Sequence, residues 1–245
     1  MRFKALKNRK THRWLTLLFG IQLIIWSITG AFMVVLQLPY IHGDHLVQQA
    51  DQRISDFQLL DKIPNLTSTF PNATEARLVN RYIDGSYTYN FVISDSAGKR
   101  LVNAHDFSPV SLTENDIREL AVRYYNAPKG NTQSEIASIQ LLTEEAPSEL
   151  SAAHLPAWRV EFSDHRATTL YLAHGTGDLV TKRHSAWRVF DFMWMLHIMD
   201  YDERSDITTP WIKFFSIMTL LIALSGTGLL AQKLLSRRWR RLWRD

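Results

Sequence analysis

Two long runs without a charged residue, one near each end of the chain, most constrain what this sequence can fold into. Residues 14–38 form a run of 25 uncharged residues, and residues 214–232 form a run of 19. As helices they would extend about 37 Å and about 28 Å, enough to cross the hydrocarbon core of a bilayer. The alternative for the first run is a cleaved signal peptide. However, the run is longer than the apolar region of a signal peptide, and no small-residue cleavage site follows it. The sequence therefore predicts transmembrane helices at residues 14–38 and 211–232, the second opened by Thr209-Pro210.

The net charge of +4 in 245 residues is distributed unevenly along the chain. Residues 1–13 carry six basic residues and no acid, and residues 233–245 carry six basic residues and one acid, so the ends sum to +11 and the remainder to −7. Basic residues that flank the outer end of each apolar run indicate that both termini are cytoplasmic. The basic C-terminal segment is therefore expected on the anionic inner leaflet of the lipid bilayer, and no nucleic acid is expected as a partner.

The intervening residues 39–210 show α+β patterns. Residues 87–94 alternate between apolar and polar, which predicts a strand, and residues 99–104 follow a turn as the returning strand. Residues 113–126 have helical spacing with Thr113 as the N-cap. Alternation resumes over residues 158–172. These patterns indicate two related α+β units, with the loop-like residues 127–156 between them.

The absence of cysteine restricts the chemistry that the chain can support. It excludes disulfides, iron–sulfur clusters, thiolate zinc sites and covalently attached c-type haem. No glycine-rich nucleotide loop, G-x-S-x-G or H-E-x-x-H motif occurs. Of the nine histidines, four lie close to a predicted membrane face: His12, His42, His45 and His197.

Several short motifs resemble those of a known family when taken in order. They are His12-Arg13-Trp14, Thr29-Gly30, Leu196-His197, Gly226-Thr227-Gly228 and the stretch WRVEFSDHRATTLYLAHGTGDLV at 158–180. Together with the topology, they resemble a short, two-span PepSY-associated transmembrane protein. The resemblance covers both apolar runs and residues 157–232 well, and residues 39–156 poorly. Larger relatives with about four spans include ferric-siderophore reductases that carry haem b between helices.

This resemblance implies a bacterial inner-membrane b-type haem protein that passes electrons outward to reduce ferric iron in the periplasm, in support of a ferrous iron transporter. The electron donor would be a quinol or another protein. The expected order is a cytoplasmic N-terminus (1–13), a transmembrane helix (14–38), a periplasmic PepSY-like α+β domain (39–183), an aromatic and acidic segment (184–210), a second transmembrane helix (211–232) and a cytoplasmic tail (233–245). Because two helices alone make a poor cofactor pocket, we expect a homodimer with a four-helix membrane bundle.

Four histidines are the candidate axial ligands of haem. His197 belongs to an aromatic series with 3, 4, 3 and 4 spacing, formed by Trp187, Phe190, Trp194, His197 and Tyr201, which could cover a haem. The alternative is an interfacial helix whose aromatic side chains rest among lipid headgroups. The second ligand would be His42 or His45 of the same chain, or His197 of a second protomer. A haem bound by His12 would require His12 of a second protomer as its other ligand. The alternative is that His12 is an interfacial residue within the basic N-terminal segment and binds no haem.

Four acids follow His197 within seven residues: Asp200, Asp202, Glu203 and Asp206. Carboxylate oxygens suit ferric iron, which is a hard cation, so these acids are candidates to hold iron as the substrate. The alternative is a solvated loop. A second function, from a different class of protein, is an alternative to the ferric iron reductase. A non-catalytic, membrane-anchored PepSY module would bind or regulate a periplasmic protein.

Overall fold

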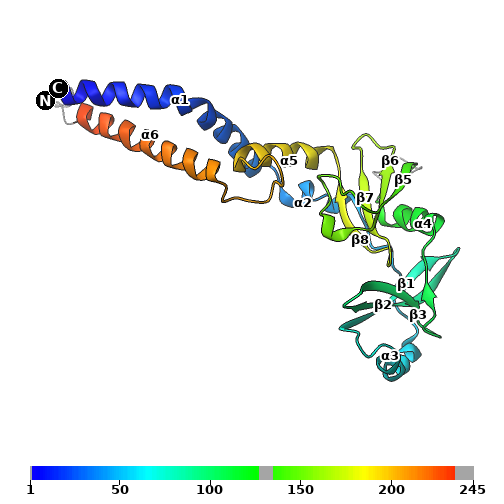
Figure 1. The fold of residues 1–245 in the computed structure, drawn as a ribbon. Coiled ribbons are helices and arrows are strands. Elements are labelled where there is room, and N and C mark those ends of the chain that lie inside the picture. The colour runs from blue at the N-terminus through cyan, green and yellow to red at the C-terminus, as the bar shows by residue number, and fades with distance from the viewer. Residues whose placement is uncertain (1, 127–134, 235–245) are drawn as a thin grey trace, which may run out of the picture. The chain divides into compact units, whose positions relative to one another are not determined.

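The computed structural model describes residues 2–126 and 135–234, which form two compact units (Figure 1). The helical unit consists of residues 2–37 and 189–234, and the body consists of the described residues between 38 and 188.

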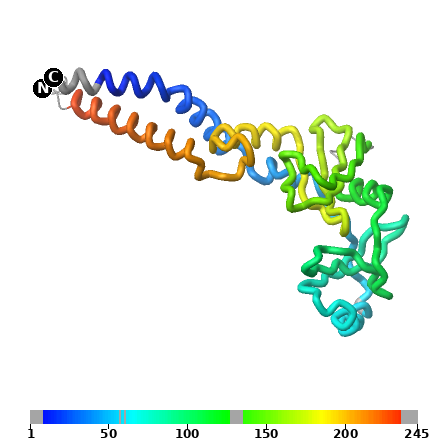
Figure 2. Tube along the Cα trace, in the orientation of Figure 1, coloured from blue at the N-terminus to red at the C-terminus, as the bar shows by residue number. Residues whose placement is uncertain are grey.

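Two long helices, α1 (Arg2–Val35) and α6 (Pro210–Leu234), lie side by side in the helical unit (Figures 1 and 2). Phe19 contacts Phe214 and Phe215 near the start of α6, with ring centroids 5.8 Å apart. His12, which is nearer the N-terminus of α1, contacts Ser225, which is nearer the C-terminus of α6. The two helices therefore run antiparallel.

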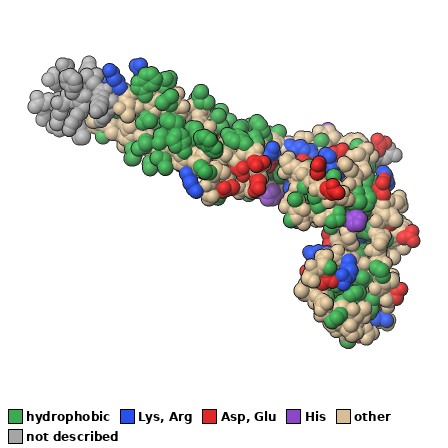
Figure 3. All heavy atoms as spheres, in the orientation of Figure 1, with side chains coloured by type: hydrophobic (Ala, Val, Ile, Leu, Met, Phe, Trp, Pro, Cys, Tyr) green, Lys and Arg blue, Asp and Glu red, His purple; other side chains and the backbone are tan. Residues whose placement is uncertain are grey.

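The outward faces of both helices are apolar. Large aliphatic side chains remain more than half exposed on each, for example Leu17, Ile21 and Ile24 on α1, and Ile217 and Leu224 on α6 (Figure 3). Both helices are long and apolar enough to cross a membrane. The two long apolar helices predicted at the ends of the chain are thus confirmed.

Helix α5 (Ser185–Ile198) begins in the body and ends in the helical unit. It stops because Met199 adopts a left-handed φ of 56°. The prediction that Tyr201 continues the aromatic face of this helix is therefore wrong. Helix α6 starts as predicted, with Pro210 as its first residue and the Oγ1 atom of Thr209 accepting a 3.3 Å hydrogen bond from the amide of Ile212.

The first half of the body contains an antiparallel sheet with strand order β1-β2-β3-β4. Its strands are β1 (Glu75–Ile83), β2 (Ser86–Asp95), β3 (Gly98–Asn103) and β4 (Pro109–Val110). Phe91, Ile93 and Val102 pack with Leu59 of the 3-10 helix η2 (Phe57–Lys62) and Leu66 of α3 (Ile63–Thr69). The strand predicted at 87–94 and its returning partner are confirmed.

The second half contains α4 (Glu114–Tyr124) and a sheet with strand order β5-β6-β7-β8. Its strands are β5 (Ile136–Leu142), β6 (Ala157–Phe162), β7 (Thr169–Ala173) and β8 (Leu179–Arg183). Ile117 and Leu120 of α4 are fully buried in one cluster with Val160, Leu170 and Leu172 of the sheet. The N-cap predicted at residue 113 is confirmed, because its side chain and that of residue 116 form a capping box.

Both halves therefore repeat one plan, a short helix followed by four sequential antiparallel strands, which confirms the predicted pair of α+β units. The interpretation of residues 127–156 as a loop is wrong for 136–142, which form β5. Residues 127–134 lie outside the described part of the chain. The strand was missed because its apolar residues do not alternate cleanly and it pairs only with β6 along its described edge.

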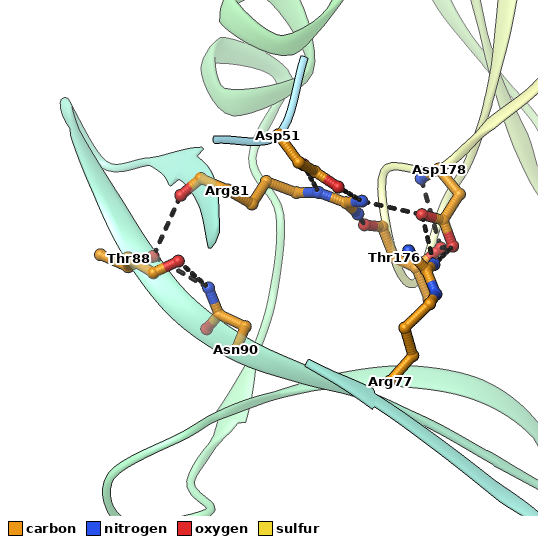
Figure 4. Close-up of polar contacts among 7 residues, drawn as sticks. All are labelled: Asp51, Arg77, Arg81, Thr88, Asn90, Thr176 and Asp178. Carbon is orange, nitrogen blue, oxygen red and sulfur yellow. Dashed lines mark hydrogen bonds and ion pairs between the residues drawn. The ribbon is translucent and has the colours of Figure 1, made fainter. Parts of the chain in front are cut away.

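A fully buried arginine joins the two halves (Figure 4). Arg81 of β1 donates to both carboxylate oxygens of Asp51 at 2.9 Å, to Asp178 at 2.8 Å and to the backbone carbonyl of Thr176. Asp178 also pairs with Arg77 at 2.9 Å. The β7–β8 turn of the second sheet is thereby fixed to the first strand of the first sheet.

Candidate functional site

His12 is held by a hydroxyl group on α6. Its Nδ1 atom lies 2.8 Å from Oγ of Ser225, and that hydroxyl lies 2.9 Å from the backbone carbonyl of Ile222, to which it donates. Because a serine hydroxyl has one hydrogen, its oxygen is left to accept a hydrogen bond from Nδ1–H of the histidine. This contact therefore favours the His12 tautomer whose Nε2 atom carries the lone pair.

His197, in the last turn of α5, has the same arrangement with a hydroxyl of α1. Its Nδ1 atom lies 2.9 Å from Oγ1 of Thr29, which donates to the carbonyl of Ile25 at 2.8 Å. The indole Nε1–H of Trp26 donates to the backbone carbonyl of His197 at 2.7 Å. Burial lowers the pKa of His197, which favours the neutral imidazole. The side chain of Thr29 is almost fully buried, so this contact is protected from water.

The two histidines thus present the same chemical group. Within residues 2–126 and 135–234, the Nε2 atom of neither imidazole has a hydrogen-bond partner. A neutral imidazole with Nδ1 held by a hydrogen bond and Nε2 free is the form that binds a metal ion. The Ser225 and Thr29 hydroxyls also fix the orientation of each ring.

A glycine follows each of these hydroxyl residues and makes room for the imidazole. A Cβ atom on Gly226 would lie 3.2 Å from Cε1 of His12, and one on Gly30 would lie 3.4 Å from Cε1 of His197. The distance at Gly226 is tighter than ordinary van der Waals contact, and the distance at Gly30 lies at its lower limit. The dipeptides Thr29-Gly30 and Ser225-Gly226 therefore each supply a hydrogen-bond partner and a space for one histidine.

The two histidine sites lie at different levels along α1. Thr29 is 17 residues beyond His12 on α1, about 25 Å along the helix axis. His12 lies beside Ser225, eight residues before Lys233, which is about 12 Å from that basic residue along α6. His12 is therefore level with the apolar part of α6, further inside the helix pair than its position in the basic N-terminal segment indicates.

The other two candidate histidines, His42 and His45, lie in the body near its α2 (Leu38–Ile41) and η1 (Asp44–Leu46) helices. The ring of His45 stacks on Tyr40, with centroids 4.9 Å apart, and its Nε2 atom accepts a 2.7 Å hydrogen bond from Arg166. His42 lines a shallow hollow with Asp44. Since Arg166 occupies the Nε2 atom of His45, this imidazole offers no free lone pair there.

Four of the five residues predicted to form the aromatic face lie on α5. Trp187 stacks against Arg183, whose Cζ atom lies 4.0 Å from the ring centroid, and the indole of Trp194 donates to the backbone carbonyl of Arg204 at 3.0 Å. Phe190 is half-buried, and Tyr201, beyond the helix end, is exposed. Trp187 and Trp194 therefore contact other residues of the chain in this structure.

The four acidic residues after α5 shape a loop. The carboxylate of Asp200 accepts hydrogen bonds from the backbone amides of Asp202, Ser205 and Asp206, at 3.3, 2.9 and 3.0 Å. Asp206 accepts from Thr208, while Asp202 and Glu203 are exposed. Over the described residues, no group of three or more His, Cys, Asp or Glu side chains is arranged to hold a metal ion. A ferric iron site in this loop remains a prediction without a preformed ligand set.

Two buried polar residues of the body escaped sequence reasoning. His184, which is 1% exposed, lies with its Nε2 atom 3.1 and 3.0 Å from the carbonyl oxygens of Tyr40 and Ile41. Arg81 joins the two sheets. Neither residue lies in a motif. Their roles depend on distant partners: Ile41 lies 143 positions from His184, and Asp178 lies 97 positions from Arg81.

No protein-family description, curated protein or solved structure matches this chain when the sequence and the fold are compared with them.

Proposed function

We propose that this chain is an inner-membrane protein that binds haem b at two levels of its helical unit, as a homodimer, and passes electrons across the membrane to ferric iron in the periplasm. The observation that carries the proposal is the matched pair of contacts that hold Nδ1 of His12 and of His197 on a hydroxyl group and leave Nε2 free. The resemblance to PepSY-associated transmembrane proteins supports the same assignment.

Membrane insertion is supported by the surface of α1 and α6. Their outward faces carry exposed aliphatic side chains. Soluble monomeric proteins rarely expose an apolar surface of this kind to water, because its hydration is unfavourable. Arg9, Lys10 and Arg13 lie at one end of this apolar surface on α1, and Lys233 lies at the same end on α6. This distribution supports an orientation with both termini in the cytoplasm and the body in the periplasm.

The dimer follows from the number of ligands at each level. Bis-histidine ligation needs two imidazoles on opposite sides of one haem, and each level of the helical unit supplies one. A second copy related by a two-fold axis would supply His12 against His12 and His197 against His197. Gly30 and Gly226 let each imidazole lie close against the helix backbone, which supports a fixed orientation of both ligands.

The residues of the chain have distinct roles in this proposal. Bound haem would supply the one-electron redox couple. His12 and His197 would hold it, Ser225 and Thr29 would keep each Nδ1 protonated, and Trp26 would dock the end of α5 on α1 through its hydrogen bond to the His197 carbonyl. The protein supplies no flavin or nicotinamide motif, so the electron donor would be a quinol or another protein.

A visible spectrum of the detergent-purified chain, produced in haem-replete cells, tests the proposal. We expect Soret and α bands that sharpen on reduction with dithionite, and reoxidation of the reduced protein by ferric citrate under nitrogen. A colourless protein would contradict haem binding and favour the non-catalytic anchored module. Haem that ferric citrate fails to reoxidise would contradict ferric iron as the acceptor and leave haem binding intact.

Because the natural chain has no cysteine, its orientation can be tested with single introduced thiols. Ser96→Cys lies in the exposed β2–β3 turn of the body, and Ser236→Cys lies in the basic C-terminal segment. A membrane-impermeant maleimide should label the first in intact spheroplasts and the second only after permeabilisation. The reverse pattern would contradict the proposed orientation.

A further inference from the structure

A cavity of about 700 Å³ lies in the body where its two sheets meet. Its walls come from the β2–β3 turn (97–99), the segment before β6 (153–156) and the β7–β8 turn with the start of β8 (173–180). Cavities between structural units are common ligand sites, and this volume falls within the range of small-molecule pockets.

The walls of the cavity are fixed in place. Asp178 is held by Arg81 and Arg77, at 2.8 and 2.9 Å, and also accepts a 3.0 Å hydrogen bond from the hydroxyl of Thr176 (Figure 4). The opposing turn touches the same loop through backbone, because a Cβ atom on Gly175 would lie only 2.8 Å from the carbonyl oxygen of Lys99. The cavity is therefore preformed.

The charge of the lining is unbalanced. Among the described residues, Asp178 is the single acidic residue that lines the cavity, and it is neutralised by the two arginines. Lys99, His154 and His174 also line it, are exposed, and make no ion pair with an acid in the part of the chain that the structure describes. One ammonium group therefore faces this space without a counter-charge, beside two imidazole rings that can donate hydrogen bonds.

Part of the remaining lining is aliphatic. Leu155, Pro156, Leu179 and Val180 contribute aliphatic surface, so the cavity is unsuited to an inorganic anion alone. We propose that this cavity binds a small organic anion with two or more carboxylates, held by Lys99, His154 and His174 and packed through its carbon skeleton against the aliphatic wall. This site is independent of haem. Polycarboxylates also chelate ferric iron. If the bound anion carried ferric iron as the electron acceptor, that role would rest on the proposed function.

Isothermal titration of citrate into the full-length, detergent-purified protein tests this site. We expect saturable binding to the natural chain, and affinity at least about tenfold weaker in Lys99→Gln and in the His154→Gln/His174→Gln double variant. His105→Gln, an exposed histidine of the body that does not line the cavity, is the matched control and should bind as the natural chain does. Acetate should not compete.

The titration also has outcomes that overturn the site. The proposed site is wrong if citrate does not bind to the natural chain. It is also wrong if the cavity variants and the His105→Gln control bind citrate with equal affinity. Because the substituted side chains are exposed, we expect each variant to fold. An unchanged thermal unfolding midpoint would verify this. Since haem bands are recorded separately, failure of this site and failure of haem binding are distinguishable.

Discussion

The Nδ1 atom of His197 lies 2.9 Å from the hydroxyl oxygen of Thr29, and this contact links the end of α5 to α1. The same hydroxyl donates to the carbonyl of Ile25, which favours a hydrogen bond that it accepts from the imidazole. A side chain on one helix thereby selects the tautomer of a histidine on another. The contact between His12 and Ser225 repeats this relationship at a second level of the helical unit.

Removing the Thr29 hydroxyl tests whether it positions His197. Thr29→Val keeps the shape of the side chain and deletes the acceptor, and partners of metal ligands typically contribute roughly 10- to 100-fold to affinity. We expect weaker haem binding at the His197 level, so that this haem is lost at higher free-haem concentrations than in the natural chain, with a shifted midpoint potential. Ser27→Ala is the control, because the hydroxyl of Ser27 donates to the Leu23 carbonyl of its own helix and contacts neither histidine among the described residues. Identical haem retention in both variants would contradict the role of Thr29.

The glycine beside His12 provides a steric test. Gly226→Ala would place a methyl group 3.2 Å from Cε1 of His12, whereas Gly228→Ala, two residues later on the same helix, would meet no atom within 4 Å. We therefore expect Gly226→Ala to displace the imidazole and lower the haem content, and Gly228→Ala to leave it unchanged. Equal haem content in the two purified variants would show that the space beside His12 is not needed.

The sequence predicted the elements whose residues interact locally. The two apolar helices, the strand around residue 91 and the cap at Thr113 follow from hydrophobic runs, alternation and capping chemistry that act over a few residues. The edge strand β5 was missed because only its central residues alternate, and a register shift between Ile136 and Ser138 breaks the period. Its assignment depends on pairing with β6, a distant segment.

Of the candidate site, the sequence indicated His12 and His197 as candidates but did not indicate the residues that hold them. His12 and His197 follow from their positions near the apolar runs. Their partners, Ser225 and Thr29, lie 213 and 168 residues away in the chain, so no local spacing could reveal them. Tyr201 was misplaced for a different reason. The aromatic spacing continues past Ile198, whereas the helix stops at a left-handed residue that the spacing does not reveal.

Loss of the buried arginine should destabilise the body. Arg81→Met leaves Asp51 without this cation and Asp178 with Arg77 alone. Removal of one partner of a buried pair costs about 3–5 kcal/mol, and because the carboxylates are 17% and 27% exposed we expect the lower end of that range. Arg77→Gln is the control, because its side chain is 46% exposed and exposed pairs contribute about 0–1 kcal/mol. The full-length variants should therefore differ clearly in chemical denaturation. Equal midpoints would contradict the role of Arg81 as the joint.

The body should lose stability in mild acid. Burial lowers the pKa of His184, and burial together with the charge of Arg166 lowers the pKa of His45, so the folded chain resists protonation of both. The unfolded chain takes up these protons below about pH 6.5, and stability therefore falls as pH drops through that value. The carboxylates of Asp178 and Glu149 have lowered pKa values, so their contribution is lost only at more acidic pH.

This pH dependence can be measured as the thermal unfolding midpoint at pH 7.5 and pH 5.5. We expect a decrease for the natural chain and a smaller decrease for the His45→Gln/His184→Gln double variant, which has no imidazole to protonate at these positions. An equal decrease in both proteins would assign the acid sensitivity to other groups.

The haem content of His12→Ala, His197→Ala and the double variant tests the central claim most directly. If each level holds its own haem between two copies of the chain, each single variant should retain about half of the haem of the natural dimer and the double variant none. His174→Ala, an exposed histidine of the body, should retain all of it. A double variant that keeps the full haem spectrum would contradict the assignment of these two histidines as ligands.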